Sequence, residues 1–386
     1  MLWGKEGDRT GPARPGRSRA VRLVAPAVAG VALVGLVAGC GSSPNTSAKS
    51  QSPSSSQATA GGTSSSSGGA SAKKVPLVIY AAEGYDVAEG KAFQKATGIP
   101  TKVDDNSTGP LTVKIEAEKN NPQWDLFWVD GNEVFSSLDQ QGMLLKGFEP
   151  SDADYNALGK RLVPSDKSYI PTGVTMAAAL VYDTKTVSHP PTSWSQLLSS
   201  KWKGEIGMND PAVSGPTYPY IAGMSQSLGG VSQGESFYKK LKSNGLHVYQ
   251  TNTNTLQALE TGSIKLATIQ SSAGTGAGFS NKNVKVAYLK PETVLPSVLG
   301  IDAHVSATAQ AEAKKFVQFV FSKAGQKVMQ SGDPTGDSLF WPLKSGEKPL
   351  KPLPPLTRVP TQIINPSVWG ARENAINTWF TDNIVQ

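Results

Sequence analysis

The chain has 386 residues, a hydrophobic content of 38% and a formal net charge of +7, a composition typical of a globular protein. Residues 1–39 hold six Lys and Arg side chains and two acids, so the remainder has 31 basic and 28 acidic residues, a net charge of +3. No run of Lys and Arg interleaved with aromatic residues follows, which excludes a nucleic-acid-binding stripe. The single cysteine, Cys40, excludes an intramolecular disulfide and a thiolate metal cluster.

Residues 1–39 have the pattern of an export signal. Four arginines between positions 14 and 22 precede an uncharged segment, 23–39, that is rich in Val, Ala, Leu and Gly. A positive flank, a short apolar segment and small residues before a cleavage point are typical of a signal peptide. The segment ends Ala38-Gly39-Cys40, which resembles a bacterial lipobox, so we predict acylation of Cys40. The alternative is an uncleaved transmembrane anchor, for which this segment is marginally long.

Residues 40–74 consist mainly of Ser, Gly, Ala, Thr and Gln. Such a segment buries too little apolar surface to offset the entropy of ordering, so we predict a disordered tether. A flexible chain of this length spans roughly 30–35 Å on average. The tether predicts a location at the membrane surface but no particular activity.

Strand and helix patterns alternate from Val75 onward. Short apolar strands are predicted at 75–80, 100–103 and 124–129, and amphipathic helices at 87–97 and 111–119. This alternation predicts an α/β fold with parallel pairing, in which ligands bind outside the carboxyl ends of the strands. The roughly 310 residues of the body exceed the usual size of one hydrophobic core, which predicts two lobes.

Two extended stretches are expected to cross between the lobes, at 170–182 and 296–301. We therefore predict a first part of lobe 1 at 75–172, lobe 2 at 173–295, and a return to lobe 1 with C-terminal helices at 296–386. Helices are predicted at 194–198, 217–228, 233–243, 253–260, 309–322 and 326–329. Further strands are predicted at 204–208, 247–249, 266–269 and 284–289.

Six segments carry a resemblance to a known family. They are 78–85 (VIYAAEGY), 93–99 (FQKATGI), 117–125 (AEKNNPQWD), 194–206, 210–215 (DPAVSG) and 313–326. In this order they resemble family 1 of the bacterial extracellular solute-binding proteins, and the most similar branch holds ferric-iron and aminoethylphosphonate binders of ABC importers. The resemblance extends over about residues 75–329.

The resemblance implies a periplasmic-binding-protein-like fold of type II. Each lobe would be a mostly parallel sheet flanked by helices, with a hinge of two strands and a ligand cleft that closes on binding. The implied function is that of a monomeric, lipid-anchored protein at the outer face of the cell membrane. It would bind a small solute, without a cofactor, and deliver it to the permease of an ABC importer.

One loop departs from the ferric-binding pattern. Ferric binders of this branch carry adjacent tyrosines after the late second-lobe strand, whereas here residues 266–269 precede Gln270-Ser271-Ser272. Ferric iron favours anionic oxygen ligands, and this loop offers neutral ones. We therefore predict no metal site, with direct iron binding kept as an alternative.

Candidate ligand contacts lie in loops next to predicted strand and helix ends. Hydroxyl and backbone N–H groups before two helices could hold an anion or cap their own helix, and both interpretations stay open. Acids at the first-lobe strand ends could bind an amine or be solvated, and the tyrosines could contact ligand or belong to the core. Together these loops favour an anionic or zwitterionic solute. The predicted contacts are Glu83, Gly84, Tyr85, Ser107, Thr108, Gly109, Asp130, Gly131, Thr172, Ser214, Gly215, Thr217, Tyr218, Asn252, Gln270 and Ser271.

Motifs for catalysis are absent from the sequence. The three histidines, His189, His247 and His304, belong to no Gly-x-Ser-x-Gly, His-Glu-x-x-His or phosphate-loop pattern. We therefore predict a protein that is not an enzyme. The alternative is a tethered hydrolase acting on a polysaccharide or phosphoester, because paired carboxylates distant in sequence can meet in a cleft.

Overall fold

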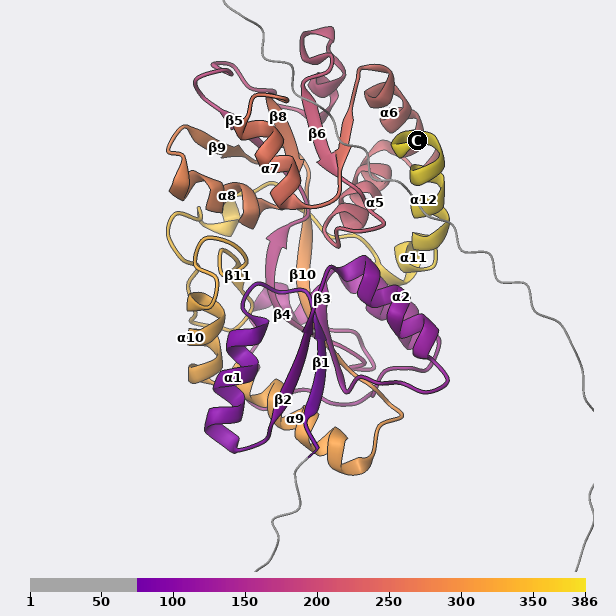
Figure 1. The fold of residues 1–386 in the computed structure, drawn as a ribbon, viewed down its shortest axis with the longest axis vertical. Coiled ribbons are helices and arrows are strands. Elements are labelled where there is room, and N and C mark those ends of the chain that lie inside the picture. The colour runs from indigo at the N-terminus through magenta and orange to yellow at the C-terminus, as the bar shows by residue number, and fades with distance from the viewer. Residues whose placement is uncertain (1–74) are drawn as a thin grey trace, which may run out of the picture. The chain divides into compact units, whose positions relative to one another are not determined.

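The computed structural model describes residues 75–386 (Figure 1). The predicted signal peptide, Cys40 and the 40–74 tether lie outside the described residues and stay predictions. Within residues 75–386, every helix is too short or too polar to cross a bilayer.

The first lobe is built on a seven-stranded sheet. Its strands are β1 (Leu77–Ala81), β2 (Thr101–Asp105), β3 (Leu126–Asp130), β4 (Ile170–Met176), β10 (Glu292–Ile301), β11 (Trp341–Pro342) and β12 (Thr361–Gln362). The order is β11-β4-β10-β3-β1-β2, with β12 paired to β10. Its helices are α1 (Asp86–Thr97), α2 (Thr108–Glu118), α3 (Asn132–Gln140), α4 (Ala157–Leu162), α9 (Ala307–Phe321) and α10 (Lys323–Ser331).

The second lobe is built on a five-stranded sheet with the order β7-β6-β8-β5-β9. The strands are β5 (Ala179–Asp183), β6 (Ile206–Asn209), β7 (His247–Tyr249), β8 (Leu266–Ile269) and β9 (Val284–Ala287). The 3₁₀ turns at Trp194–Leu198 and Ser200–Trp202 precede β6. The helices are α5 (Thr217–Leu228), α6 (Val231–Ser243), α7 (Asn252–Glu260), α8 (Ser271–Ser280), α11 (Pro366–Gly370) and α12 (Glu373–Phe380), and a π-helical turn at Thr381–Val385 follows.

Both sheets are mixed, which corrects the prediction of mostly parallel sheets. β1 runs parallel to β2 and β3, but β10 runs antiparallel to both β3 and β4. In the second sheet β6 runs parallel to β7 and β8, while β5 is antiparallel to β8 and β9. In the first sheet, β4 and β10 carry the chain in opposite directions between the lobes, so they pair antiparallel (Figure 1).

The core divides at the two connecting strands. Met176 packs in the first-lobe core and Ala177 in the second, and on β10 Leu295 packs in the second-lobe core while Leu299 packs in the first. The C-terminal helices α11 and α12 bury Trp369 in the second-lobe core. Residues 296–386 therefore divide between both lobes, because α9 and α10 contribute to the first-lobe core, whereas Ile376 and Phe380 of α12 lie in the second-lobe core.

Candidate ligand-binding site

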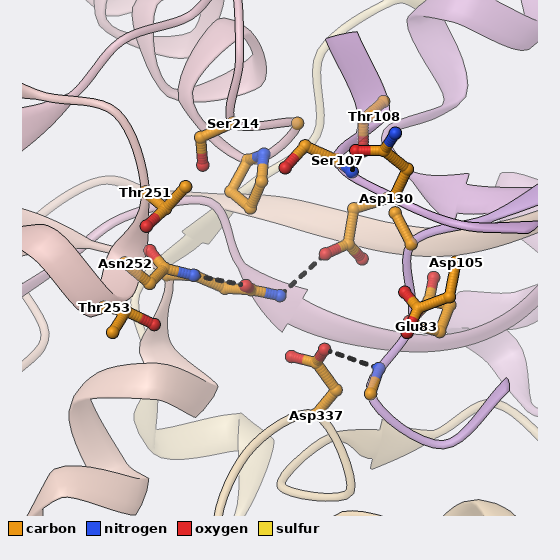
Figure 2. A pocket seen from close by; sticks show the side chains of 16 residues that line it. Glu83, Asp105, Ser107, Thr108, Asp130, Ser214, Thr251, Asn252, Thr253 and Asp337 are labelled. Atoms are coloured by element: carbon orange, nitrogen blue, oxygen red, sulfur yellow. Dashed lines mark hydrogen bonds between the residues drawn. The ribbon is translucent and has the colours of Figure 1, made fainter. Parts of the chain in front are cut away.

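A cavity of about 460 Å³ lies between the lobes where the parallel strands end. Loops after β1, β2 and β3 line it from the first lobe, and loops after β6, β7 and β8 line it from the second (Figure 2). This is the carboxyl-end edge at which open α/β sheets bind ligands. The lining residues are Ala82, Glu83, Gly84, Asp105, Asn106, Ser107, Thr108, Asp130, Ser214, Gly215, Pro216, Thr251, Asn252, Thr253, Gln270 and Asp337.

A chain of hydrogen bonds crosses this cavity. The Gln270 Nε2 donates to Asp130 Oδ2 at 2.7 Å and to Thr175 Oγ1 at 3.3 Å. The Gln270 Oε1 accepts from Asn252 Nδ2 at 3.2 Å, and Asn252 Oδ1 accepts from Asn209 Nδ2 at 2.7 Å. The first-lobe carboxylate of Asp130 is thereby tied to the loops of the second lobe (Figure 2).

Glu83 is held from behind by a buried serine. The Ser297 hydroxyl donates to Glu83 Oε1 at 2.7 Å, and it accepts from Trp128 Nε1 at 2.9 Å and from Thr172 Oγ1 at 3.0 Å. The Tyr85 hydroxyl lies 3.4 Å from the Ser297 Oγ. This cluster fixes the Glu83 carboxylate at the end of β1, on the floor of the cavity.

The first-lobe side of the cavity is acidic. Burial raises the pKa of Glu83 well above its ordinary value, and the nearby Asp130 and Asp337 raise it further. Burial also raises the pKa of Asp130, with Asp337 adding to the shift and the Gln270 amide opposing it. Burial raises the pKa of Asp337 as well. No Lys, Arg or His side chain belongs to the lining residues, so these carboxylates have no cationic partner there.

Helix starts supply the neutral polar groups of the site. Ser107 precedes α2 without capping it through its side chain, so its hydroxyl is free for another partner. Ser214 likewise does not cap α5, and its hydroxyl accepts from Asn209 Nδ2 at 3.1 Å. By contrast, Thr251 caps α7 by accepting from the Asn254 N–H. Capping therefore accounts for the hydroxyl of Thr251 but not for those of the two serines.

Nine of the predicted contacts line the cavity together. They are Glu83, Gly84, Ser107, Thr108, Asp130, Ser214, Gly215, Asn252 and Gln270. All nine stand in strand-end or helix-start loops, the places from which the fold class predicts ligand contacts.

Four other predicted residues lie in the interior and are not among the lining residues. Tyr85 is 1% exposed and packs against Trp128 with ring centroids 5.4 Å apart. Tyr218 and Thr217 lie buried on α5, where the Tyr218 hydroxyl donates to the Trp369 carbonyl. Thr172 is fully buried and donates to the Ser297 hydroxyl. Each is directed into a core, which the local sequence does not reveal.

The last three predicted residues do not line the cavity and instead stabilise or permit the backbone conformation beside it. The Ser271 hydroxyl accepts from the Met176 N–H at 3.0 Å, which ties α8 to the end of β4. Gly131 turns β3 into α3 with a φ of 94°, a conformation that favours glycine. Gly109 lies against the second lobe, where an added Cβ would stand 2.1 Å from the Ala212 carbonyl oxygen.

Several lining residues were not among the predicted contacts. Asp105 is the last residue of β2 and Asn106 follows it. The signal for both was the strand end, which lies two residues beyond its predicted position. Asp337 has no local signal, since it comes from the turn between α10 and β11. It reaches the cavity by accepting from the Gly84 N–H at 2.9 Å and from the Ser272 hydroxyl at 3.2 Å.

The described residues do not form an evident metal site. In the part of the chain that the structure describes, no group of three or more His, Cys, Asp and Glu side chains is arranged to hold a metal ion. No tyrosine lines the cavity either.

Comparison with known proteins agrees with this geometry. The model of the bacterial extracellular solute-binding proteins matches residues 90–336. The chain belongs to this family. The prediction from the sequence is thereby confirmed, and the molecule is an extracellular solute-binding protein.

Two relatives carry different ligand names. A periplasmic protein of Salmonella typhimurium, whose name provisionally assigns it to 2-aminoethylphosphonate, is 24% identical over 246 residues, which cover 61% of this chain and 68% of that one. The major ferric iron-binding protein of Neisseria meningitidis serogroup B is 26% identical over 266 residues, which cover 66% and 78%. The relatives therefore agree on solute binding and differ in the solute.

A solved structure shows the same fold. The periplasmic binding protein AfuA from Actinobacillus pleuropneumoniae, with fructose-6-phosphate bound, superposes with a TM-score of 0.71 at 20% identity. The match covers 80% of this chain and 98% of AfuA. The predicted type II periplasmic-binding-protein fold of this solute-binding protein is confirmed.

Proposed function

We propose that this solute-binding protein is the substrate-binding component of an ABC importer. It is held at the outer face of the cell membrane by an acylated Cys40 and acts as a monomer. It takes up a small polar solute between its lobes and releases it to the membrane permease. The observation that carries this proposal is the interlobe cavity, which loops from both sheets line with hydroxyl, amide and carboxylate groups.

Contacts between the lobes support a mechanism of closure. The Gly109 N–H donates to the Val213 carbonyl at 3.2 Å, and the Gln270 amide bridges to Asp130 at 2.7 Å. Both contacts require the lobes to be close together. A solute that adds contacts to both lobes favours this arrangement over an open one, and the closed form is what a permease can distinguish.

Ferric iron is the second candidate, favoured by the carboxylate oxygens of Glu83, Asp130 and Asp337 in the lining. We place it second because the two tyrosines among the predicted contacts, Tyr85 and Tyr218, direct their hydroxyls to Ser297 and Trp369. Tight binding of ferric salts with a tyrosine-to-iron charge-transfer colour would reverse this order.

The proposal is tested by thermal unfolding of the full chain with a panel of small solutes. We expect saturable, stoichiometric stabilisation by one solute class, and recovery of that solute chemically unchanged. Chemical conversion of the solute would instead favour the tethered hydrolase, and loss of stabilisation across the whole panel would contradict solute binding.

A further inference from the structure

We propose that the solute carries a positively charged nitrogen, an ammonium or a guanidinium, which binds the Asp130 carboxylate with Glu83 and Asp337 around it. This inference rests on the proposed function and names the chemical class that the same cavity selects. It narrows the solute to small organic cations and to zwitterions that present their cationic end to the floor of the first lobe.

The acidity of the cavity is local. Residues 75–386 carry 28 Lys and Arg side chains and 28 Asp and Glu side chains, so this part of the chain has no excess of acid. The lining nevertheless contains Glu83, Asp105, Asp130 and Asp337 and no basic side chain. Lys114, on the neighbouring helix α2, is paired with Asp104 at 2.6 Å and does not balance them.

Asp130 has one carboxylate oxygen that is available to a solute. It is 7% exposed, and its Oδ2 accepts from Gln270. Its Oδ1 has no hydrogen-bond partner within residues 75–386, although the side chain lines the cavity (Figure 2). A carboxylate removed from water without a charged partner is unfavourable, and a bound ammonium or guanidinium relieves this by a charge-assisted hydrogen bond.

The surrounding acids are fixed in place before a solute arrives. Glu83 is 3% exposed and receives the Ser297 hydroxyl, and Asp337 receives the Gly84 N–H and the Ser272 hydroxyl. Neutral donors orient these acids but supply no positive charge, so burial raises the pKa of each, and a bound cation would favour the ionised form. The cavity therefore attracts cations and repels purely anionic solutes, which would place like charges together at low dielectric.

The experiment compares amines with analogues in which hydroxyl groups replace the amino groups. The full chain is titrated by thermal shift and calorimetry with two pairs, 1,4-diaminobutane against 1,4-butanediol and 2-aminoethylphosphonate against 2-hydroxyethylphosphonate. Agmatine, inorganic phosphate, glucose and ferric citrate are titrated singly. We expect binders only among the amines and guanidines, with each hydroxyl analogue at least about tenfold weaker.

Variants test whether Asp130 binds the positively charged group of the solute. Asp130→Asn should weaken binding of the cationic solute by about 10–100-fold, the loss expected for a hydrogen bond to a charged group. Asp337→Asn serves as a second variant with a smaller loss in the same direction. Glu260→Gln, which changes an exposed carboxylate at the end of α7, should leave the affinity unchanged.

The outcomes separate this inference from the proposed function. Binding of glucose, phosphate or ferric citrate in place of the amines would overturn the inference and leave solute binding intact. Equal affinity of an amine and its hydroxyl analogue would also overturn it, without any variant having to fold. Absence of binding by every class would contradict the proposed function itself.

Discussion

The side-chain amide of Gln270 joins the two lobes by donating to Asp130 at 2.7 Å while accepting from Asn252 at 3.2 Å. Gln270 directly follows β8 of the second sheet, and Asp130 is the last residue of β3 of the first. The bond therefore runs across the cavity between two strand ends. It also sets the orientation of the Asp130 carboxylate, which we propose binds the solute.

Removal of this amide should weaken solute binding. In Gln270→Leu, both Asp130 and Asn252 lose a buried partner, so we expect the affinity to fall at least about tenfold. Calorimetric titration with the amine or guanidine that binds most tightly in the panel measures the change. Gln233→Leu, at an exposed position of α6, is the matched control and should bind as the unmodified chain does. Unchanged affinity in Gln270→Leu would show that Asp130 needs no orienting donor.

Closure should depend on Gly109. A Cβ at this position would stand 2.1 Å from the Ala212 carbonyl oxygen, a backbone atom that cannot rotate away. Gly109→Ala should therefore hold the lobes apart, so that solute binds more weakly and no longer reduces the radius of gyration in small-angle scattering. Gly278→Ala, where the added Cβ has ordinary contact at 3.4 Å, should close normally. Full compaction of Gly109→Ala by solute would contradict the role of this contact.

The cluster behind Glu83 should contribute to stability. Ser297→Ala leaves Trp128 Nε1, Thr172 Oγ1 and Glu83 Oε1 without their shared partner. We expect the free energy of unfolding to fall by about 1–3 kcal/mol, the cost of unpaired buried polar groups. Urea unfolding measures this, with Ser232→Ala at an exposed position of α6 expected to have almost no effect. A loss as small as that of the control would mean that water replaces the hydroxyl.

The pH dependence of stability should respond to Glu133. This residue is 2% exposed, and burial raises its pKa from 4.5 to about 7. Between these values the folded state binds more protons than the unfolded state, so this group lowers stability as the pH rises. Glu133→Gln should match the unmodified chain near pH 4 and exceed its unfolding free energy by up to about 3 kcal/mol above pH 8.

The difference between the two proteins cancels the contribution of the buried acids that do not interact with Glu133. Burial and Glu133 together raise the pKa of Glu373 to about 8, so part of the gain comes from relief of repulsion between the two. Urea unfolding at pH 4, 6, 7 and 9 gives the two curves. Parallel curves over this range would show that the Glu133 carboxyl is solvated.

The proposed lipid anchor is tested by one substitution. Cys40→Ser removes the thiol that would be acylated, so we expect the protein to move from the membrane fraction to the medium. Solute affinity should not change, since the cavity is built by residues 82–337. Retention of Cys40→Ser in the membrane fraction would point to an uncleaved apolar anchor.

The sequence by itself determined the α/β fold class, most of the strands and several of the loops that line the cavity. Alternating apolar runs and amphipathic helices are local patterns, and parallel strands align their carboxyl ends whatever the side chains are. The loop at Ser107 and the acid Asp130 could therefore be placed at the cavity before any coordinates.

The glycine-rich segment after β8 shows how tertiary contacts override local preference. Residues 270–272 were predicted as a loop, yet Ser271 begins helix α8. Gly274 lies where a Cβ would stand 2.4 Å from Val181 Cγ2, and Gly276 where one would stand 1.7 Å from the Thr335 carbonyl oxygen. Glycine weakens an isolated helix, but here it permits close packing that stabilises the helix in the fold.

Only the tertiary structure decided which side chains line the cavity. Tyr85 and Glu83 stand two residues apart at the end of β1, and one packs into the core while the other lines the cavity. Asp337 reaches the cavity from a turn some 250 residues after Gly84, its partner. Side-chain direction and contacts between distant segments depend on how the whole chain packs, and no local pattern of residues encodes them.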